Sequence, residues 1–159
     1  MVALVAVVLA HTALTSMPDP GAARPIEVAY TSSAIGCVIQ PQGEMDNHFV
    51  VYRCPGVPGY PVWVAYAEGV RMSLAIGDNP TYEGIFSTRR DSNWPVEWRG
   101  YRASRFQPYA AIIRVEGIEG GQMLAVYGVL RDGRSCLRGT ETTNEAARAL
   151  ADATAGHHC

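Results

Sequence analysis

From residue 26 onward, the chain is a succession of short segments in which apolar and polar residues alternate, separated by residues that favour turns. Val62 to Tyr66 and Arg71 to Ile76 each place apolar side chains at every second position, the period of a strand with one buried face. The apolar segment Gln122 to Leu130 is followed by an Asp-Gly pair within Arg131–Arg134, a strong hairpin signal. The same reasoning predicts strands at Ile26 to Ser32, His48 to Cys54, Pro95 to Tyr101 and Tyr109 to Glu116, and an irregular turn at Pro55 to Gly59.

The period changes from that of a strand to that of a helix near the C-terminus. Thr142 and Glu145 match the Thr-x-x-Glu capping box. Apolar residues then recur at helical spacing, and Gly156 favours a helix end; the recurring residues are Ala146, Ala149, Leu150 and Ala153. We therefore predict one mainly β (α+β) domain over residues 24–159: a curved antiparallel sheet or partly closed barrel, with one C-terminal helix of about 14 residues packed on it.

Composition narrows the classes of protein that the chain can belong to. An apolar fraction of 48% in 159 residues excludes a disordered chain. All 13 basic residues are Arg, which excludes a P-loop lysine, a Schiff-base lysine and a Ser-x-x-Lys acyl enzyme. The formal charge of −2 creates no field that would attract nucleic acid, so we do not expect a nucleic-acid partner.

Residues 1–23 resemble a signal peptide. Val2 to Ala10 is an uninterrupted apolar run, too short for a membrane span, and Pro18 breaks any helix that follows it. Small residues favour cleavage after Ala23, which would leave no membrane span. No Arg or Lys precedes the apolar run, so a buried N-terminal strand or helix is the alternative interpretation.

The chain has four cysteines, Cys37, Cys54, Cys136 and Cys159, at spacings that match no common zinc motif. An even number of cysteines agrees with an exported protein, periplasmic or secreted, whose cysteines form disulfides. Of the three pairings we favour Cys37–Cys54 and Cys136–Cys159, because the predicted helix would run back along the preceding strand and return Cys159 to Cys136. Four reduced thiols in a cytosolic protein are the alternative.

The stretch from residue 89 to 109 combines arginines with large aromatic residues, which concentrate binding energy at protein interfaces. Its candidate binding residues are Arg89, Arg90, Trp94, Trp98, Arg99, Tyr101, Arg102 and Arg105. Arg can pair with carboxylates or phosphates and stack on aromatic rings. The alternative is that these side chains merely cover a sheet.

Known catalytic motifs are absent from the sequence: it contains no Gly-x-Ser-x-Gly, His-Glu-x-x-His or Gly-x-Gly-x-x-Gly. His48 is the candidate base if the protein is a small hydrolase. His157 and His158 beside Cys159 suggest a metal site, but a disulfide at Cys159 would leave them on a solvated helix end. We therefore expect no catalytic residue, no metal and no cofactor.

The segment Tyr52 to Gly56, the hairpin of residues 60–77 and the Ala-rich end at Cys159 resemble small exported bacterial proteins of unknown function, which share the four-cysteine layout with sequential pairing. Tyr52-Arg53-Cys54 and the segment Val62 to Ile76 are also faintly similar to the β-barrel inhibitors of C-type lysozyme. The Ser-Gly-x-x-Tyr loop of those inhibitors is missing here, and they lack the terminal helix.

The leading hypothesis is an exported, non-enzymatic binding domain whose partner is an envelope protein or an anionic envelope component. A small periplasmic hydrolase or hydrolase inhibitor, and a purely structural envelope protein, are the alternatives.

Overall fold

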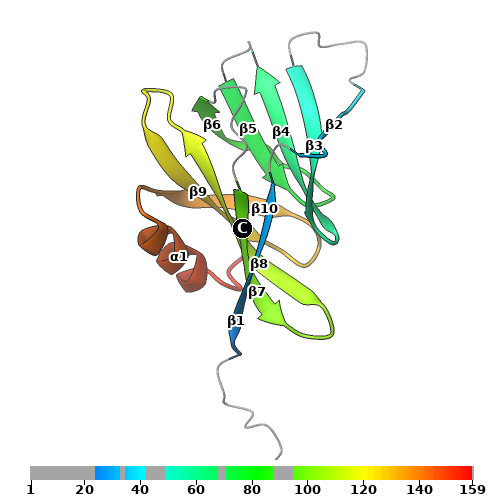
Figure 1. The fold of residues 1–159 in the computed structure, drawn as a ribbon, viewed down its shortest axis with the longest axis vertical. Coiled ribbons are helices and arrows are strands. Elements are labelled where there is room, and N and C mark those ends of the chain that lie inside the picture. Colours follow the sequence, from blue (N-terminus) through cyan, green and yellow to red (C-terminus); the bar gives the residue numbers. More distant parts are fainter. Residues whose placement is uncertain (1–23, 33–34, 42–48, 68–70, 88–94, 159) are drawn as a thin grey trace, which may run out of the picture.

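A computed structural model describes residues 24–32, 35–41, 49–67, 71–87 and 95–158. These residues form ten strands and one helix (Figure 1). The strands are β1 (Ile26–Ser32), β2 (Val38–Ile39), β3 (Phe49–Val57), β4 (Tyr60–Ala67), β5 (Arg71–Ile76), β6 (Glu83–Ser87), β7 (Pro95–Arg102), β8 (Phe106–Glu116), β9 (Gln122–Val129) and β10 (Ser135–Glu141), followed by the helix α1 (Asn144–Ala153).

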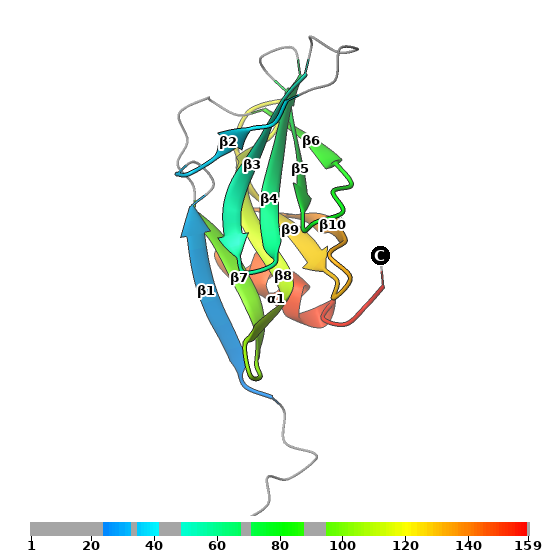
Figure 2. The same cartoon turned by 90° about the vertical axis from the view of Figure 1, so that its right-hand side faces the viewer.

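All ten strands belong to one antiparallel sheet that curls into a half-barrel (Figures 1 and 2). The strand order is β1-β7-β8-β6-β5-β4-β3-β2, and β9 pairs with β8 and β10. The link between β6 and β8 is a single pair, Ser87 with Glu116, so the sheet bends there. The predicted fold class, a curved antiparallel sheet with one C-terminal helix packed on it, is confirmed.

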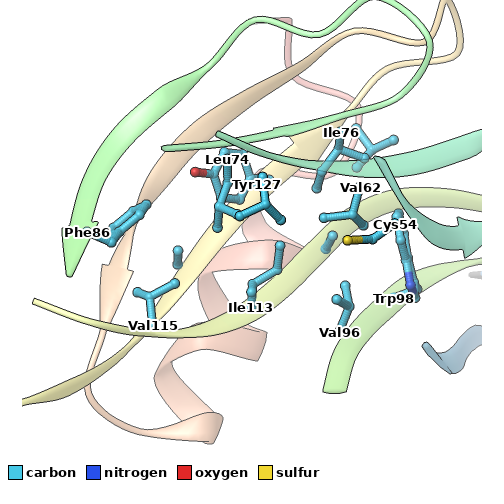
Figure 3. Close-up of a cluster of buried hydrophobic side chains, with 14 of the residues drawn as sticks. Cys54, Val62, Leu74, Ile76, Phe86, Val96, Trp98, Ile113, Val115 and Tyr127 are labelled. Atoms are coloured by element: carbon cyan, nitrogen blue, oxygen red, sulfur yellow. The ribbon is translucent and has the colours of Figure 1, made fainter. Parts of the chain in front are cut away.

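The main core fills the inside of the curl (Figure 3). Trp98 of β7 is fully buried among side chains from β3 to β5, including Val62 and Ile76. Tyr127 of β9 donates its hydroxyl to the carbonyl of Glu83 at 2.7 Å, which satisfies its polar atom. The alternating residues identified in the sequence thus form the concave face.

A second core lies on the other face of the sheet, under α1. Ala147 and Ala151 are fully buried against β8 and β9, where Ile112 and Val126 are the facing residues. Their methyl groups let the helix approach the sheet closely. This second layer explains why β8 and β9 are buried on both faces, as the apolar sequence of β9 predicts.

The helix differs in detail from the prediction. Its N-cap is Thr143, which accepts a hydrogen bond from the backbone of Ala146 at 3.2 Å, so the predicted capping box at Thr142 is wrong by one residue. The helix has ten residues instead of about 14. The predicted stripe is also displaced, because Ala149 and Ala153 are exposed.

Two segments of the sheet were also predicted incorrectly. β3 continues past Cys54 to Val57 through a bulge, so only Pro58 and Gly59 form the turn that was expected over residues 55–59. The strand β6 was not predicted, because its left-handed Gly84 (φ 77°) and its irregular register with β5 interrupt the alternation.

The disulfide Cys37–Cys54 ties the segment before β2 to β3, as predicted. Cys136 is also disulfide-bonded. Cys159, its predicted partner, and the predicted signal peptide at residues 1–23 lie outside the described residues, so that pairing and the cleavage after Ala23 stay predictions. Within the described ranges, no helix is both long and apolar enough to cross a membrane.

Candidate functional site

The predicted binding stretch does not form one surface. Arg89, Arg90 and Trp94 lie outside the described residues. Trp98 has 0% of its surface exposed, and its indole nitrogen donates to the hydroxyl of Thr31 at 2.8 Å. Its assignment to a binding surface is therefore wrong, because it is part of the main core.

Arg99 is also unavailable to a partner, with only 8% of its surface exposed. Its Nε and Nη2 atoms donate to the two carboxylate oxygens of Asp152 on α1, both at 2.7 Å. This forked geometry is the strongest form of Arg–carboxylate pair. The prediction that Arg99 binds a partner is wrong, because it joins the helix to β7.

Glu97, two residues before Arg99 on β7, is the centre of the same group of polar side chains. Arg148 of α1 donates from Nε and Nη2 to the two oxygens of Glu97, both at 2.8 Å. Arg99 Nη1 and the hydroxyl of Tyr30 on β1 also donate to Glu97, each at 3.2 Å. We call these side chains, with Asp152 and Tyr109, the helix-anchoring network: Tyr30, Glu97, Arg99, Tyr109, Arg148 and Asp152.

The charges of the helix-anchoring network stabilise one another. Burial would raise the pKa of Glu97, but the hydrogen bond and positive charge of Arg148, with the hydrogen bonds from Arg99 and Tyr30, outweigh it and hold that pKa below its ordinary value. The fork from Arg99 lowers the pKa of Asp152, against a smaller opposing effect of burial. Burial and the hydrogen bond to Asp152, 2.6 Å long, raise the pKa of the Tyr109 hydroxyl. Both carboxylates stay ionised at neutral pH.

The remaining candidate residues lie at one end of the molecule, where the start of β1 and the β7–β8 hairpin lie side by side (Figures 1 and 2). Ile26 pairs with Tyr101, and the exposed Arg24 precedes it by two residues at the same end of the sheet as the hairpin. Arg102 and Arg105 are exposed there, and Arg102 forms an ion pair with Glu27. We call Arg24, Arg102 and Arg105 the basic end. Three arginines against Glu27 give it a local charge of +2, in a chain whose formal charge is −2.

Tyr101 lies between the basic end and the helix-anchoring network. It is half-buried, and its ring lies 4.9 Å from the ring of Tyr109, measured between centroids, at an interplanar angle of 41°. The ring of Tyr101 therefore packs on Tyr109, and part of the residue stays exposed.

The other candidate residues do not gather with these. His48 lies outside the described residues. His157 and His158 are exposed after α1, and their backbone carbonyls accept hydrogen bonds from Arg138 at 2.5 and 3.0 Å. Over the ranges that the structure describes, no three His, Cys, Asp or Glu side chains form a group that could hold a metal ion.

Sequence reasoning missed the helix-anchoring network and the outer face of β1. Asp152 and Arg148 lie 53 and 51 residues from their partners on β7, and no local pattern reveals such pairs. The outer face of β1 did leave a signal, since Ile26, Val28 and Tyr30 alternate in the sequence. The alternation predicted a strand at Ile26 to Ser32 but did not show that these three side chains are exposed.

Comparison of the chain with family models, with curated proteins and with solved structures finds no match. The likeness to small exported bacterial proteins and to lysozyme inhibitors therefore stays a prediction.

Proposed function

We propose that this protein is an exported, disulfide-stapled, non-enzymatic domain that binds an acidic protein segment through the basic end. The observation that carries the proposal is that three exposed arginines lie at one end of the sheet: Arg24 just before β1, and Arg102 and Arg105 at the β7–β8 hairpin, with β1 paired to β7. Arg side chains recognise carboxylates through forked hydrogen bonds, and a positive patch on a slightly acidic protein steers acidic partners to that patch.

The ion pairing and exposure of these three arginines support binding of a partner. Arg24 and Arg105 form no ion pair with any carboxylate that the structure describes. The side chain of Arg102 is 76% exposed, and an exposed pair such as Arg102–Glu27 costs little to exchange for a pair with a partner. All three cations are thus accessible to a partner's carboxylates.

The helix-anchoring network supports a binding role over a catalytic one. A general acid or base needs a proton that it can exchange with a substrate near neutral pH. Glu97 and Asp152 instead have lowered pKa values and are surrounded by hydrogen-bond donors of the protein itself. Their charges stabilise the docking of α1 on the sheet.

Two observations support export. The Cys37–Cys54 disulfide is of the kind that persists in oxidising compartments. The apolar run at Val2 to Ala10 precedes the folded domain, as a signal peptide does. We infer that the protein acts in the periplasm or outside the cell.

A charge-reversal experiment tests the proposed function. Binding of a fluorescent poly-glutamate peptide is measured by anisotropy for the wild-type protein and for the double variant Arg102→Glu, Arg105→Glu. We expect at least tenfold weaker binding for the variant, and weaker wild-type binding as salt rises, because these charges are exposed. The control, Arg71→Glu with Arg131→Glu, changes the net charge equally at exposed sites elsewhere. Equal loss in both double variants would contradict the assignment to the basic end.

A further inference from the structure

We propose that β1 pairs with the β1 strand of a second copy of this protein, antiparallel, about a two-fold axis that passes beside Val28. The two half-barrels would then share one continuous sheet. This inference concerns the edge of β1 and does not rest on the proposed function of the basic end.

β1 is an edge strand without the features that usually protect such strands. It is the first strand in the sheet order, and β7 is its only ladder partner in the part of the chain that the structure describes. Its register with β7 runs through all seven residues without a bulge. Edge strands are normally shortened, bulged or carry free charges, because an open edge pairs readily with another strand. The single charge on β1, Glu27, is neutralised by Arg102.

The other sheet edges have the protection that β1 lacks. β2 has only two residues. β10 has an irregular register between Leu137 and Gly139, and α1 packs against it. β1, which lies along the outer margin of the molecule in Figure 2, has contacts with β3 but no ladder with it, and is therefore the longest edge strand without a bulge or a covering helix.

The exposed face of β1 is also apolar. Ile26, Val28 and Tyr30 are 46%, 41% and 59% exposed, and we call them the β1 stripe. They lie on the face that carries α1, because they are paired with Tyr101, Arg99 and Glu97 of β7. The helix packs on β8, β9 and β10 and leaves this part of the face open. A contiguous exposed apolar stripe beside an open edge is typical of an interaction surface.

The order of residues in β1 favours a second copy as the partner. In an antiparallel pair, directly opposite residues point to the same face. With the axis at Val28, Ile26 lies opposite Tyr30 of the second copy, and Val28 lies opposite Val28, so the two stripes become one. Glu27 then lies opposite Ala29, and no like charges meet.

Other registers join the two stripes less completely. A register shifted by one residue would place the stripe of one copy opposite the inward face of the other. Centring the axis on Ala29 would oppose Ile26 to Ser32 and leave it without an apolar partner. The register centred on Val28 is therefore the one that matches all three members of the stripe.

The length of the β1–β1 contact sets how stable the dimer is expected to be. Seven residues at about 3.3 Å each give a strand of about 23 Å, which is short for a stable interface. We therefore expect a dimer that depends on protein concentration, and not a permanent one.

The test is analytical ultracentrifugation of the protein with its disulfides formed, over a range of concentrations. We expect reversible dimers for the wild type. Val28→Arg should raise the dissociation constant at least tenfold, because it places two positive charges opposite each other at the axis. Val38→Arg is the matched control, because Val38 is also exposed but lies on the opposite edge of the sheet. Arg105→Glu alone, which keeps the Arg102–Glu27 pair, should leave the dimer unchanged, which separates this inference from the proposed function.

A crosslinking experiment tests the register independently. Val28→Cys should form a disulfide between copies, because the two side chains meet at the axis. Ile26→Cys should not, because its copies lie on opposite sides of the axis. A protein that stays monomeric up to millimolar concentration would overturn the proposal, as would equal crosslinking of both variants. A monomer that adds an extended peptide at β1 would assign the edge to a different partner and would overturn it too.

Discussion

Glu97 gives the most direct test of how the helix is held on the sheet. The residue is 9% exposed, and its carboxylate receives hydrogen bonds from Arg148, Arg99 and Tyr30. Glu97→Gln keeps the shape of the side chain but removes the charge, and it replaces one acceptor oxygen with a donor amide that faces the guanidinium groups. One of the two forked bonds from Arg148 is then lost, and repulsion between donors replaces it.

The expected loss of stability in Glu97→Gln follows from what its two arginine partners can do once the charge is removed. Removing one member of a buried ion pair typically costs about 3–5 kcal/mol. The cost here is smaller, because Arg99 keeps Asp152 as a partner and Arg148 can turn toward water. We therefore expect a loss of about 2 kcal/mol in the free energy of unfolding at pH 7, and a melting temperature lower by about 8 °C.

The assay is denaturant and thermal unfolding followed by circular dichroism, with Glu27→Gln as the matched control. Glu27 also pairs with an arginine, Arg102, but that pair is exposed. Its loss should leave the melting temperature unchanged within error. If Glu97→Gln melts at the same temperature as Glu27→Gln, the helix is held by apolar packing alone, and our account of the helix-anchoring network is wrong.

The same variant, Glu97→Gln, tests how the stability contributed by Glu97 depends on pH. The pKa of Glu97 is lowered in the folded state, so its stabilising contribution is complete above the unfolded value near 4.5 and is lost as the pH falls through the folded value. The difference in stability between the wild type and Glu97→Gln should therefore be largest at neutral pH and shrink below pH 4.5. A difference that stays constant down to the acid unfolding of both proteins would contradict the assigned charge state.

Two further predictions concern the sheet. Replacing Cys37 and Cys54 with Ser should lower the free energy of unfolding by about 3 kcal/mol, because the disulfide closes a short loop. The measurement is denaturant unfolding of the variant and of the oxidised wild type. No change would mean that the strands already hold this loop. Gly77→Ala should lower the free energy of unfolding by more than about 2 kcal/mol, because its new Cβ would lie 2.1 Å from the carbonyl oxygen of Gly133. The control Gly120→Ala has a similar positive φ but no atom within 4 Å, and it should cost about 1 kcal/mol. Equal melting temperatures for the two variants would refute the close approach of Gly77 to Gly133.

The sequence predicts the parts of the fold that depend on local patterns. The bounds predicted for β1, Ile26 to Ser32, match the structure, and the Asp-Gly pair before Arg134 forms the β9–β10 turn, where Gly133 has a φ of 80°. These features need only neighbouring residues to be recognised. β6 lacks such a pattern, because its register with β5 is broken and its conformation depends on neighbouring strands.

The candidate site was predicted less well, for a related reason. Composition alone cannot tell an arginine that binds a partner from one that binds its own protein. Arg99 and Arg102 are three residues apart in sequence, yet Arg99 is buried in a pair with Asp152 of α1, whereas Arg102 is exposed at the end of β7. Only the packing of α1 on the sheet separates the two roles.

Disulfide mapping of protein recovered from its host, combined with determination of its N-terminal residue, tests the account of an exported domain most directly. We predict a chain that begins at Arg24 and contains the peptides linked through Cys37–Cys54 and Cys136–Cys159. Recovery of a chain that still begins at Met1, with its four thiols free, would contradict export and the functional proposal built on it.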